Sequence, residues 1–252
     1  MKKSTPPTLL TTVLASLLLP AALAAETVME WTFSSQTPGS LIQTATSTGS
    51  QQVPLTSPVA FEPEAVQTGE TVSAGFTAAK RQMLLSEATD VLAFDANQPF
   101  TIELWFQYHS TSDSGRSMLS NRAFKSQDPA MPGITLMIRG TESSGARRVG
   151  AFIDFGDQDV FLTSSTPLEP DTWHHLAVRR DEKGRLDLVV DHKSVDSAKT
   201  TQNGPLHSPQ PLFIGRTANS TSADGYFDGI IQAVRVSNAF IYAKDFLPNR
   251  AE

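Results

Sequence analysis

The sequence predicts an all-β protein, a two-sheet antiparallel β-sandwich of the jelly-roll kind. From Glu26 onward, short runs rich in β-branched and aromatic residues alternate with clusters of Gly, Pro, Asn, Asp and Ser. No segment shows a sustained apolar period of 3.6 residues, so long amphipathic helices are not expected. Many short strands at this spacing are typical of two sheets packed around one core.

The strands expected from these runs extend along most of the chain. Between the first two of them, residues 34–77 are dominated by Thr, Ser, Gln, Gly and Pro. We expect this region to be a long, loosely patterned connection within one domain, because the first strand alone could not form a core. The expected strands are Val28–Phe33, Phe100–Tyr108, Gly133–Ile138, Val149–Phe155, His175–Arg180, Arg185–Val190, Leu212–Ile214 and Phe227–Val236.

The first 25 residues have the layout of a secretory signal peptide. Two lysines precede an apolar stretch from Leu9 to Leu19, and the small-residue run Ala22-Leu23-Ala24 follows. An uncleaved anchor is the alternative, but a spanning helix needs about 20 apolar residues. We expect cleavage after Ala24 or Ala25, so that residues 26–252 form a secreted or periplasmic domain.

Composition excludes several classes of function. The net charge is −6 and no long run of Lys or Arg occurs, which argues against nucleic acid as a partner. The chain has no Cys, so a disulfide framework, a thiol nucleophile and a thiolate metal site are excluded. After the signal peptide no apolar stretch is long enough to predict a membrane span.

The histidine-rich stretch from Trp173 to Val195, "WHHLAVRRDEKGRLDLVVDHKSV", predicts a β-hairpin rather than a metal site. Gly184 supplies the positive φ that a tight turn needs between the two strands. His174 and His175 are successive, so in a strand they point to opposite faces and cannot jointly hold one metal. We expect one of them to face solvent and the other to pack near Trp173.

Four motifs occur in an order that resembles a laminin-G-like jelly-roll domain of the concanavalin A-like lectin and glucanase superfamily. The resemblance covers nearly all of residues 26–252, and it implies a fold that hosts lectins, adhesion modules, surface proteins and some glycosidases. The motifs are "FTIELWF" (Phe100–Phe106), "DTWHHLAVRRDEKGRLDLVVD" (Asp171–Asp191), "LFIGR" (Leu212–Arg216) and "GYFDGIIQAVRVSNAFIYAKDFLPN" (Gly225–Asn249).

The chain departs from the family pattern at two places. Asp191-His192-Lys193 stands where the family usually has an Asp-Gly turn, so a non-Gly residue is expected in a left-handed conformation. Gln232 and Ala233 stand where the family usually has one or two acidic residues. Any role of those carboxylates is therefore in doubt here.

One face of the strand Phe100–His109 carries the candidate ligand-binding residues Glu103, Trp105, Gln107 and His109. The resemblance implies that this face belongs to the concave sheet surface where related folds bind glycans. Trp105 would then stack on a sugar ring while the polar side chains bind its hydroxyl groups. The alternative is structural: Trp105 lies buried under a loop and Glu103 pairs with a neighbouring Arg.

The stretch "DFGDQD" contains three carboxylates, Asp154, Asp157 and Asp159, in a strand end and turn. Hard oxygen ligands at this density favour Ca²⁺, and the resemblance implies calcium at the rim of the sandwich. The alternative is a solvated acidic turn, because Asp is a common turn residue. Calcium is thus a candidate cofactor with these three residues as its candidate ligands.

Catalytic patterns are missing from the sequence. Glycosidases of this fold place paired carboxylates on one strand as Glu-x-Asp-x-Glu, and this triplet does not occur. Neither does a Gly-x-Ser-x-Gly nucleophile elbow. We therefore expect an exported, non-catalytic module that binds carbohydrate or a cell-surface protein. The alternatives are a glycan-cleaving hydrolase or lyase with carboxylates from separate strands, and a structural or assembly protein without a small ligand.

Overall fold

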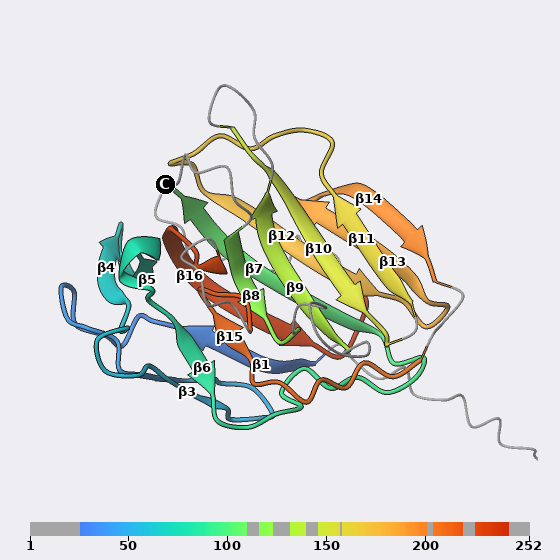
Figure 1. Cartoon of the computed structure of the whole chain (residues 1–252), viewed down its shortest axis with the longest axis horizontal. Helices are drawn as coiled ribbons and strands as arrows, with labels where there is room; N and C mark the ends of the chain where they lie inside the picture. The colour runs from blue at the N-terminus through green and yellow to red at the C-terminus, as the bar shows by residue number, and fades with distance from the viewer. Residues whose placement is uncertain are drawn as a thin grey trace, which may run out of the picture.

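The computed structural model confirms the predicted fold class, with two antiparallel sheets of eight strands each packed face to face (Figure 1). One short 3-10 turn, η1 (Ala78–Lys80), accompanies the strands. No helix among the described residues has the length and hydropathy needed to cross a membrane. The residues that the structure describes are 26–109, 116–122, 132–139, 146–156, 158–200, 204–218 and 225–241.

Strands of the two sheets are mixed in their order along the chain. Sheet A has the order β14-β13-β12-β7-β16-β5-β4, with β1 also paired to β16, and sheet B has the order β11-β10-β9-β8-β15-β6-β3-β2. The strands of sheet A are β1 (Thr27–Thr32), β4 (Glu64–Thr68), β5 (Thr71–Phe76), β7 (Phe100–Tyr108), β12 (His174–Arg180), β13 (Arg185–Val190), β14 (Lys193–Lys199) and β16 (Gly229–Ser237). Those of sheet B are β2 (Thr44–Thr46), β3 (Pro54–Thr56), β6 (Leu84–Ser86), β8 (Arg116–Ser120), β9 (Gly133–Arg139), β10 (Arg148–Asp154), β11 (Asp159–Thr163) and β15 (Phe213–Ile214).

Residues 34–77 are not the loose connection that the composition predicts. They contain β2 and β3 of sheet B and β4 and β5 of sheet A. In β2 and β3 only the middle residue is buried, Ala45 in one strand and Leu55 in the other. Strands of three residues show too little alternation to be recognised, and tertiary pairing rather than local pattern defines them.

The core lies between the sheets and confirms the alternation expected for β7. Phe100, Ile102, Leu104 and Phe106 are fully buried and belong to one apolar cluster. The predicted hairpin of β12 and β13 adds its own apolar row to the same cluster. That row consists of Leu176, Val178, Leu186, Leu188 and Val190.

Two turns of the hairpin region have the conformations that the sequence predicts. Gly184 joins β12 to β13 with φ +79°. Asp191 and His192 join β13 to β14 with φ +46° and +66°, so both non-Gly residues are left-handed. Such conformations cost non-Gly residues about 1–2 kcal/mol each, and surrounding contacts must compensate for this strain.

Arg180 lies on the core side of β12. It is fully buried, and its guanidinium donates hydrogen bonds to the carbonyl oxygens of Asp95, Gln98 and Gly204 at 2.7–3.0 Å. Burial lowers the pKa of Arg180 to about 10, so the side chain stays charged at neutral pH. The charged side chain thus holds the β6–β7 and β14–β15 connections against the end of β12.

We predict that Arg180→Met lowers the free energy of unfolding by about 3 kcal/mol or more, because three carbonyl groups lose their charged donor. Urea unfolding monitored by tryptophan fluorescence measures this loss. Arg185→Met is the matched control, since the Arg185 side chain is 53% exposed on the same hairpin. Equal losses in the two variants would contradict the role assigned to Arg180.

Candidate functional site

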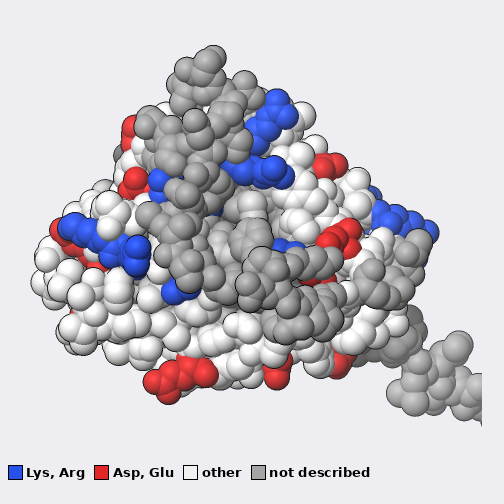
Figure 2. Space-filling view, viewed as in Figure 1, with Lys and Arg blue, Asp and Glu red and all other residues white. Residues whose placement is uncertain are grey.

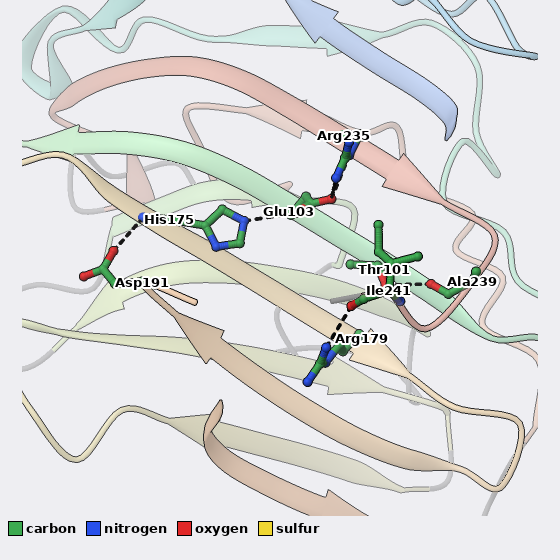
Figure 3. Close-up of polar contacts among 8 residues, drawn as sticks. All are labelled: Thr101, Glu103, His175, Arg179, Asp191, Arg235, Ala239 and Ile241. Carbon is green, nitrogen blue, oxygen red and sulfur yellow. Dashed lines mark hydrogen bonds and ion pairs between the residues drawn. The ribbon is translucent and has the colours of Figure 1, made fainter. Parts of the chain in front are cut away.

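The outer face of sheet A carries a buried ion cluster centred on Glu103 of β7. The Arg235 Nε donates to Glu103 Oε1 at 2.7 Å, and His175 Nε2 lies 3.0 Å from Oε2. Figure 3 shows Glu103 between these two partners, which come from the neighbouring strands β16 and β12. Glu103 is 0% exposed, so both oxygens of its carboxylate are used inside the protein.

Trp105, the aromatic residue of the predicted site, is covered. Its side chain is buried and packs with Ala233. The rings of His175 and His192 lie against it, with centroid distances of 5.3 and 5.8 Å. The left-handed turn at the end of β13 places His192 there, so the non-Gly departure from the family turn helps to close this face.

Gln107 and His109, at the end of the same row, remain accessible. Gln107 is half-buried and its amide donates to the carbonyl of Asp171, while His109 is exposed and its Nδ1 contacts the Asp171 carboxylate. The structure therefore separates the four predicted residues into a closed pair, Glu103 and Trp105, and an open pair. Their role in ligand binding stays a prediction, and only the open pair is accessible to a ligand in this conformation.

His174 and His175 point to opposite faces of β12, as strand geometry predicts. The expectation that one of them faces solvent is wrong, because both faces of β12 are covered and both residues are buried. His174 packs on Phe106, and its ring nitrogens lie 2.9 Å from Asp191 Oδ2 and 3.1 Å from the carbonyl oxygen of Glu169.

Asp191 connects the turn to these two histidines. Partial burial raises the pKa of the Asp191 carboxyl, but hydrogen bonds from the His174 ring and the His175 amide, with the attraction of both side chains, outweigh burial. The net pKa lies below the ordinary value of 3.8. The charged carboxylate therefore stabilises the folded state.

The acidic stretch after β10 does not form a ready-made calcium site in the part of the chain that is described. Asp154 is fully buried, its Oδ2 lies 3.4 Å from Arg122 Nε, and its Oδ1 accepts the Gly156 amide. Asp159 of β11 lies opposite Asp154 in register and is exposed. Asp157 lies outside the described residues. No group of three or more His, Cys, Asp or Glu side chains is placed to hold a metal among the described residues. Calcium stays an untested prediction, and Asp154, already paired, does not fit it.

A pair of acids from separate strands does lie on the outer face of sheet A. Glu30 of β1 and Glu103 of β7 are both registered with Arg235 of β16, so two strand spacings, about 10 Å, separate their backbones. Burial raises the pKa of Glu30, the charge of Arg235 lowers it, and that of Glu103 raises it. The guanidinium occupies the interval where a glycosidase would hold the scissile bond and its water.

The outer face of sheet B presents two neighbouring aromatic side chains. Phe152 of β10 and Phe161 of β11 are directly opposite in register, half-buried, with ring centroids 5.9 Å apart. A Cβ at Gly150 would lie 2.9 Å from the Phe161 ring, so glycine at this position lets the ring rest on the strand. The two half-buried rings form an apolar platform on this face.

Two guanidinium groups lie over these rings. The Cζ of Arg122 is 3.8 Å from the Phe152 centroid, and that of Arg139 is 4.5 Å from the Phe161 centroid. Arg122 is buried and paired with Asp154, whereas Arg139 is exposed at the end of β9. We call Arg122, Phe152, Phe161 and Arg139 the cation–aromatic row.

Sequence reasoning missed this row although a signal was present. The predicted strand Val149–Phe155 alternates Val149, Ala151 and Ile153 with outward positions, and Phe152 is an aromatic residue at one of them. An apolar ring at a position that alternation assigns to solvent indicates recognition or packing from outside. The partners Arg122 and Phe161 come from other strands and loops, and only the fold brings them together.

A family model described as the concanavalin A-like lectin/glucanases superfamily matches residues 83–245, about two thirds of the chain. No curated protein matches the sequence. The match covers β7, the hairpin of β12 and β13, and the strands β9 to β11 of sheet B.

Solved structures with the same fold include parts of toxins and of an enzyme, all at low sequence identity. The binding domain of Paraclostridial Mosquitocidal Protein 1 aligns with a TM-score of 0.61 and 10% identity over 86% of this chain and 49% of that one. A chain of botulinum neurotoxin type C, whose cell entry depends on interaction with two ganglioside molecules, gives 0.61 and 10% over 87% and 50%. This chain thus spans about half the length of those toxin chains.

A third structure is similar over almost its whole length. Domain 4 of AbnA, an extracellular arabinanase from Geobacillus stearothermophilus, was solved in complex with arabinotriose. It aligns with a TM-score of 0.56 and 11% identity over 85% of this chain and 93% of that domain. At such identities these similarities establish the sandwich fold alone.

We predict that Glu103→Gln lowers the free energy of unfolding by about 3–5 kcal/mol, because Arg235 and His175 lose a buried anionic partner. Chemical denaturation measures the change. Glu64→Gln, at an exposed position of β4 in the same sheet, is the control and should stay within about 0.5 kcal/mol of wild type. A loss below about 1 kcal/mol for Glu103→Gln would show that the cluster does not hold the sheet.

The lowered pKa of Asp191 predicts a stability difference that depends on pH. Its folded-state pKa lies below 3.8, so its stabilising effect is complete above that value and is lost as pH falls through the folded pKa. The stability gap between wild type and Asp191→Asn should therefore be largest near neutral pH and shrink below pH 3.8. Thermal unfolding of both proteins across this range is the measurement; a gap that widens in acid would refute the assignment.

Proposed function

We propose that this chain, which belongs to the concanavalin A-like lectin/glucanases superfamily, is an exported, non-catalytic module that binds carbohydrate. The observation that carries the proposal is the aromatic pair Phe152 and Phe161 on the outer face of sheet B. Aromatic rings bind the C–H faces of sugar rings, and the neighbouring Arg139 supplies hydrogen-bond donors for oxygen atoms.

The non-catalytic part of the proposal is supported by the state of the available acids. Glu103 is buried and paired with both Arg235 and His175, so it cannot reach a substrate. Arg235 also fills the interval between Glu103 and Glu30. A hydrolase needs two carboxylates that flank an accessible glycosidic bond, and this arrangement leaves no room for one.

The exported part rests on the predicted signal peptide. The backbone of Glu26 is hydrogen-bonded to Asn238 through both its amide and its carbonyl. A chain cleaved after Ala25 keeps both bonds. Mass spectrometry of the exported protein would show a mature chain that starts at Ala25 or Glu26.

A flat, apolar exposed patch would favour the alternative of a structural or assembly protein. The large hydrophobic residues that are strongly exposed in the described part of the chain are Leu41 and Val59. Stable assembly interfaces usually bury much larger contiguous apolar areas. The surface therefore favours a small or polar ligand over a large protein interface.

We predict that the chain from Glu26 binds carbohydrate on a glycan array and that Phe161→Ala reduces binding at least tenfold, since stacking on one aromatic ring contributes about 1–3 kcal/mol. Phe240→Ala is the matched control, because Phe240 is also half-buried under an arginine but lies on sheet A. Thermal unfolding shows that both variants are folded. Arrays with calcium and with chelator test the metal prediction in the same experiment.

Variants of the open pair distinguish the two candidate faces. If Gln107→Ala with His109→Ala abolishes binding and Phe161→Ala does not, the ligand site lies at the end of β7 and the proposed face is wrong. If wild type binds no glycan with or without calcium, the carbohydrate proposal itself is wrong. Loss of binding in Phe161→Ala with both other variants unchanged supports the face proposed here.

A further inference from the structure

We infer that the cation–aromatic row recognises glycans that carry carboxylate groups, with Arg139 as the residue that binds the carboxylate. This inference rests on the proposed function and specifies the chemical class of its ligand. A neutral sugar needs only an apolar platform and hydrogen-bonding groups of moderate strength. The guanidinium over Phe161 favours a ligand that also carries an anionic group.

Arg139 is a cation without an anionic partner among the described residues. It is exposed, and its guanidinium is held over the Phe161 ring at 4.5 Å. Stacking on the ring restrains the side chain and leaves the N–H edge of the guanidinium open to the solvent. A guanidinium fixed in this way is suited to accept a planar carboxylate through two parallel hydrogen bonds.

A second arginine lies directly across from it. Arg148, the first residue of β10, is paired in register with Arg139, and both are exposed on the outer face of sheet B. Side chains at such opposed positions have Cβ atoms about 4.5–5.5 Å apart. Arg139 is thus the residue of this pair that the proposal assigns to the ligand.

The two ends of the row differ in charge. Figure 2 shows basic and acidic side chains interspersed over this face, so the difference comes from local pairing and not from a wholly positive surface. At one end of the row, Asp154 neutralises Arg122. At the Arg139 end, no described carboxylate is paired with Arg139 beside the Phe161 platform.

The aromatic ring and the guanidinium would bind different parts of the ligand. Phe161 rests on Gly150 and against Phe152, which holds the ring in place for a sugar face. Arg139 lies over that ring, so its guanidinium is placed to meet an acid substituent of a sugar bound at the row. Uronic acids and sialic acids both combine a ring with C–H faces and a carboxylate, and this shared chemistry defines the ligand class.

The test compares ligands that differ only in the acid group. The probes are oligogalacturonate with its methyl-esterified form, and sialyllactose with lactose, measured by calorimetry against the chain from Glu26. We expect the acidic form of at least one pair to bind more tightly than its neutral counterpart. We also expect Arg139→Gln to weaken binding of that acid about 10- to 100-fold, as for loss of a hydrogen bond to a charged group.

Arg185→Gln is the matched control, because it removes an exposed arginine from the outer face of sheet A, where Asp187 remains paired with Arg179. Equal weakening by Arg139→Gln and Arg185→Gln would mean general attraction to a charged surface and would overturn the inference. So would equal binding of acidic and neutral forms with loss only in Phe161→Ala, an outcome that leaves the proposed carbohydrate binding intact. Absence of binding to any glycan would overturn the proposed function as well.

Discussion

The paired carboxylate of Glu103 is the interaction on which the organisation of sheet A depends. It joins β7 to β16 through Arg235 and to β12 through His175, so one side chain links three adjacent strands on the face opposite the core. A charge buried on both sides is tolerated only when its hydrogen-bonding capacity is used, and both oxygens are used here. The cluster thus lets a central strand be buried on both faces, one apolar and one ionic.

Closure of that face has a direct consequence for recognition. The segment after β16 adds further cover, since the carbonyl of Ala239 accepts from Thr101 and that of Ile241 from Arg179 (Figure 3). The central strands of sheet A therefore use Glu103, His175 and Arg179 internally, whereas sheet B keeps Phe152 and Phe161 partly exposed. The same fold provides two outer faces, and that of sheet B presents the cation–aromatic row.

Local pattern predicted the parts of the fold that depend on nearest neighbours. The alternation in β7, the Gly184 turn and the left-handed Asp191-His192 turn are all consequences of strand geometry and backbone sterics, which sequence reports directly. Burial of Trp105 under a loop was one of the two expectations for it, but the covering residue was not predictable, because His192 lies 87 positions away in the chain. Arg180 shows the same limit, since its carbonyl acceptors lie in distant connections.

The cation–aromatic row explains why two similar arginine–phenylalanine contacts serve different purposes. Arg122 is buried and neutralised by Asp154, so its contact with Phe152 contributes rigidity and no net charge. Arg139 makes the equivalent contact at the exposed end, where its charge is not used by a described carboxylate. A site whose charged group is already held in place loses less entropy when a ligand binds. A carboxylate is therefore taken up by a group already held in position.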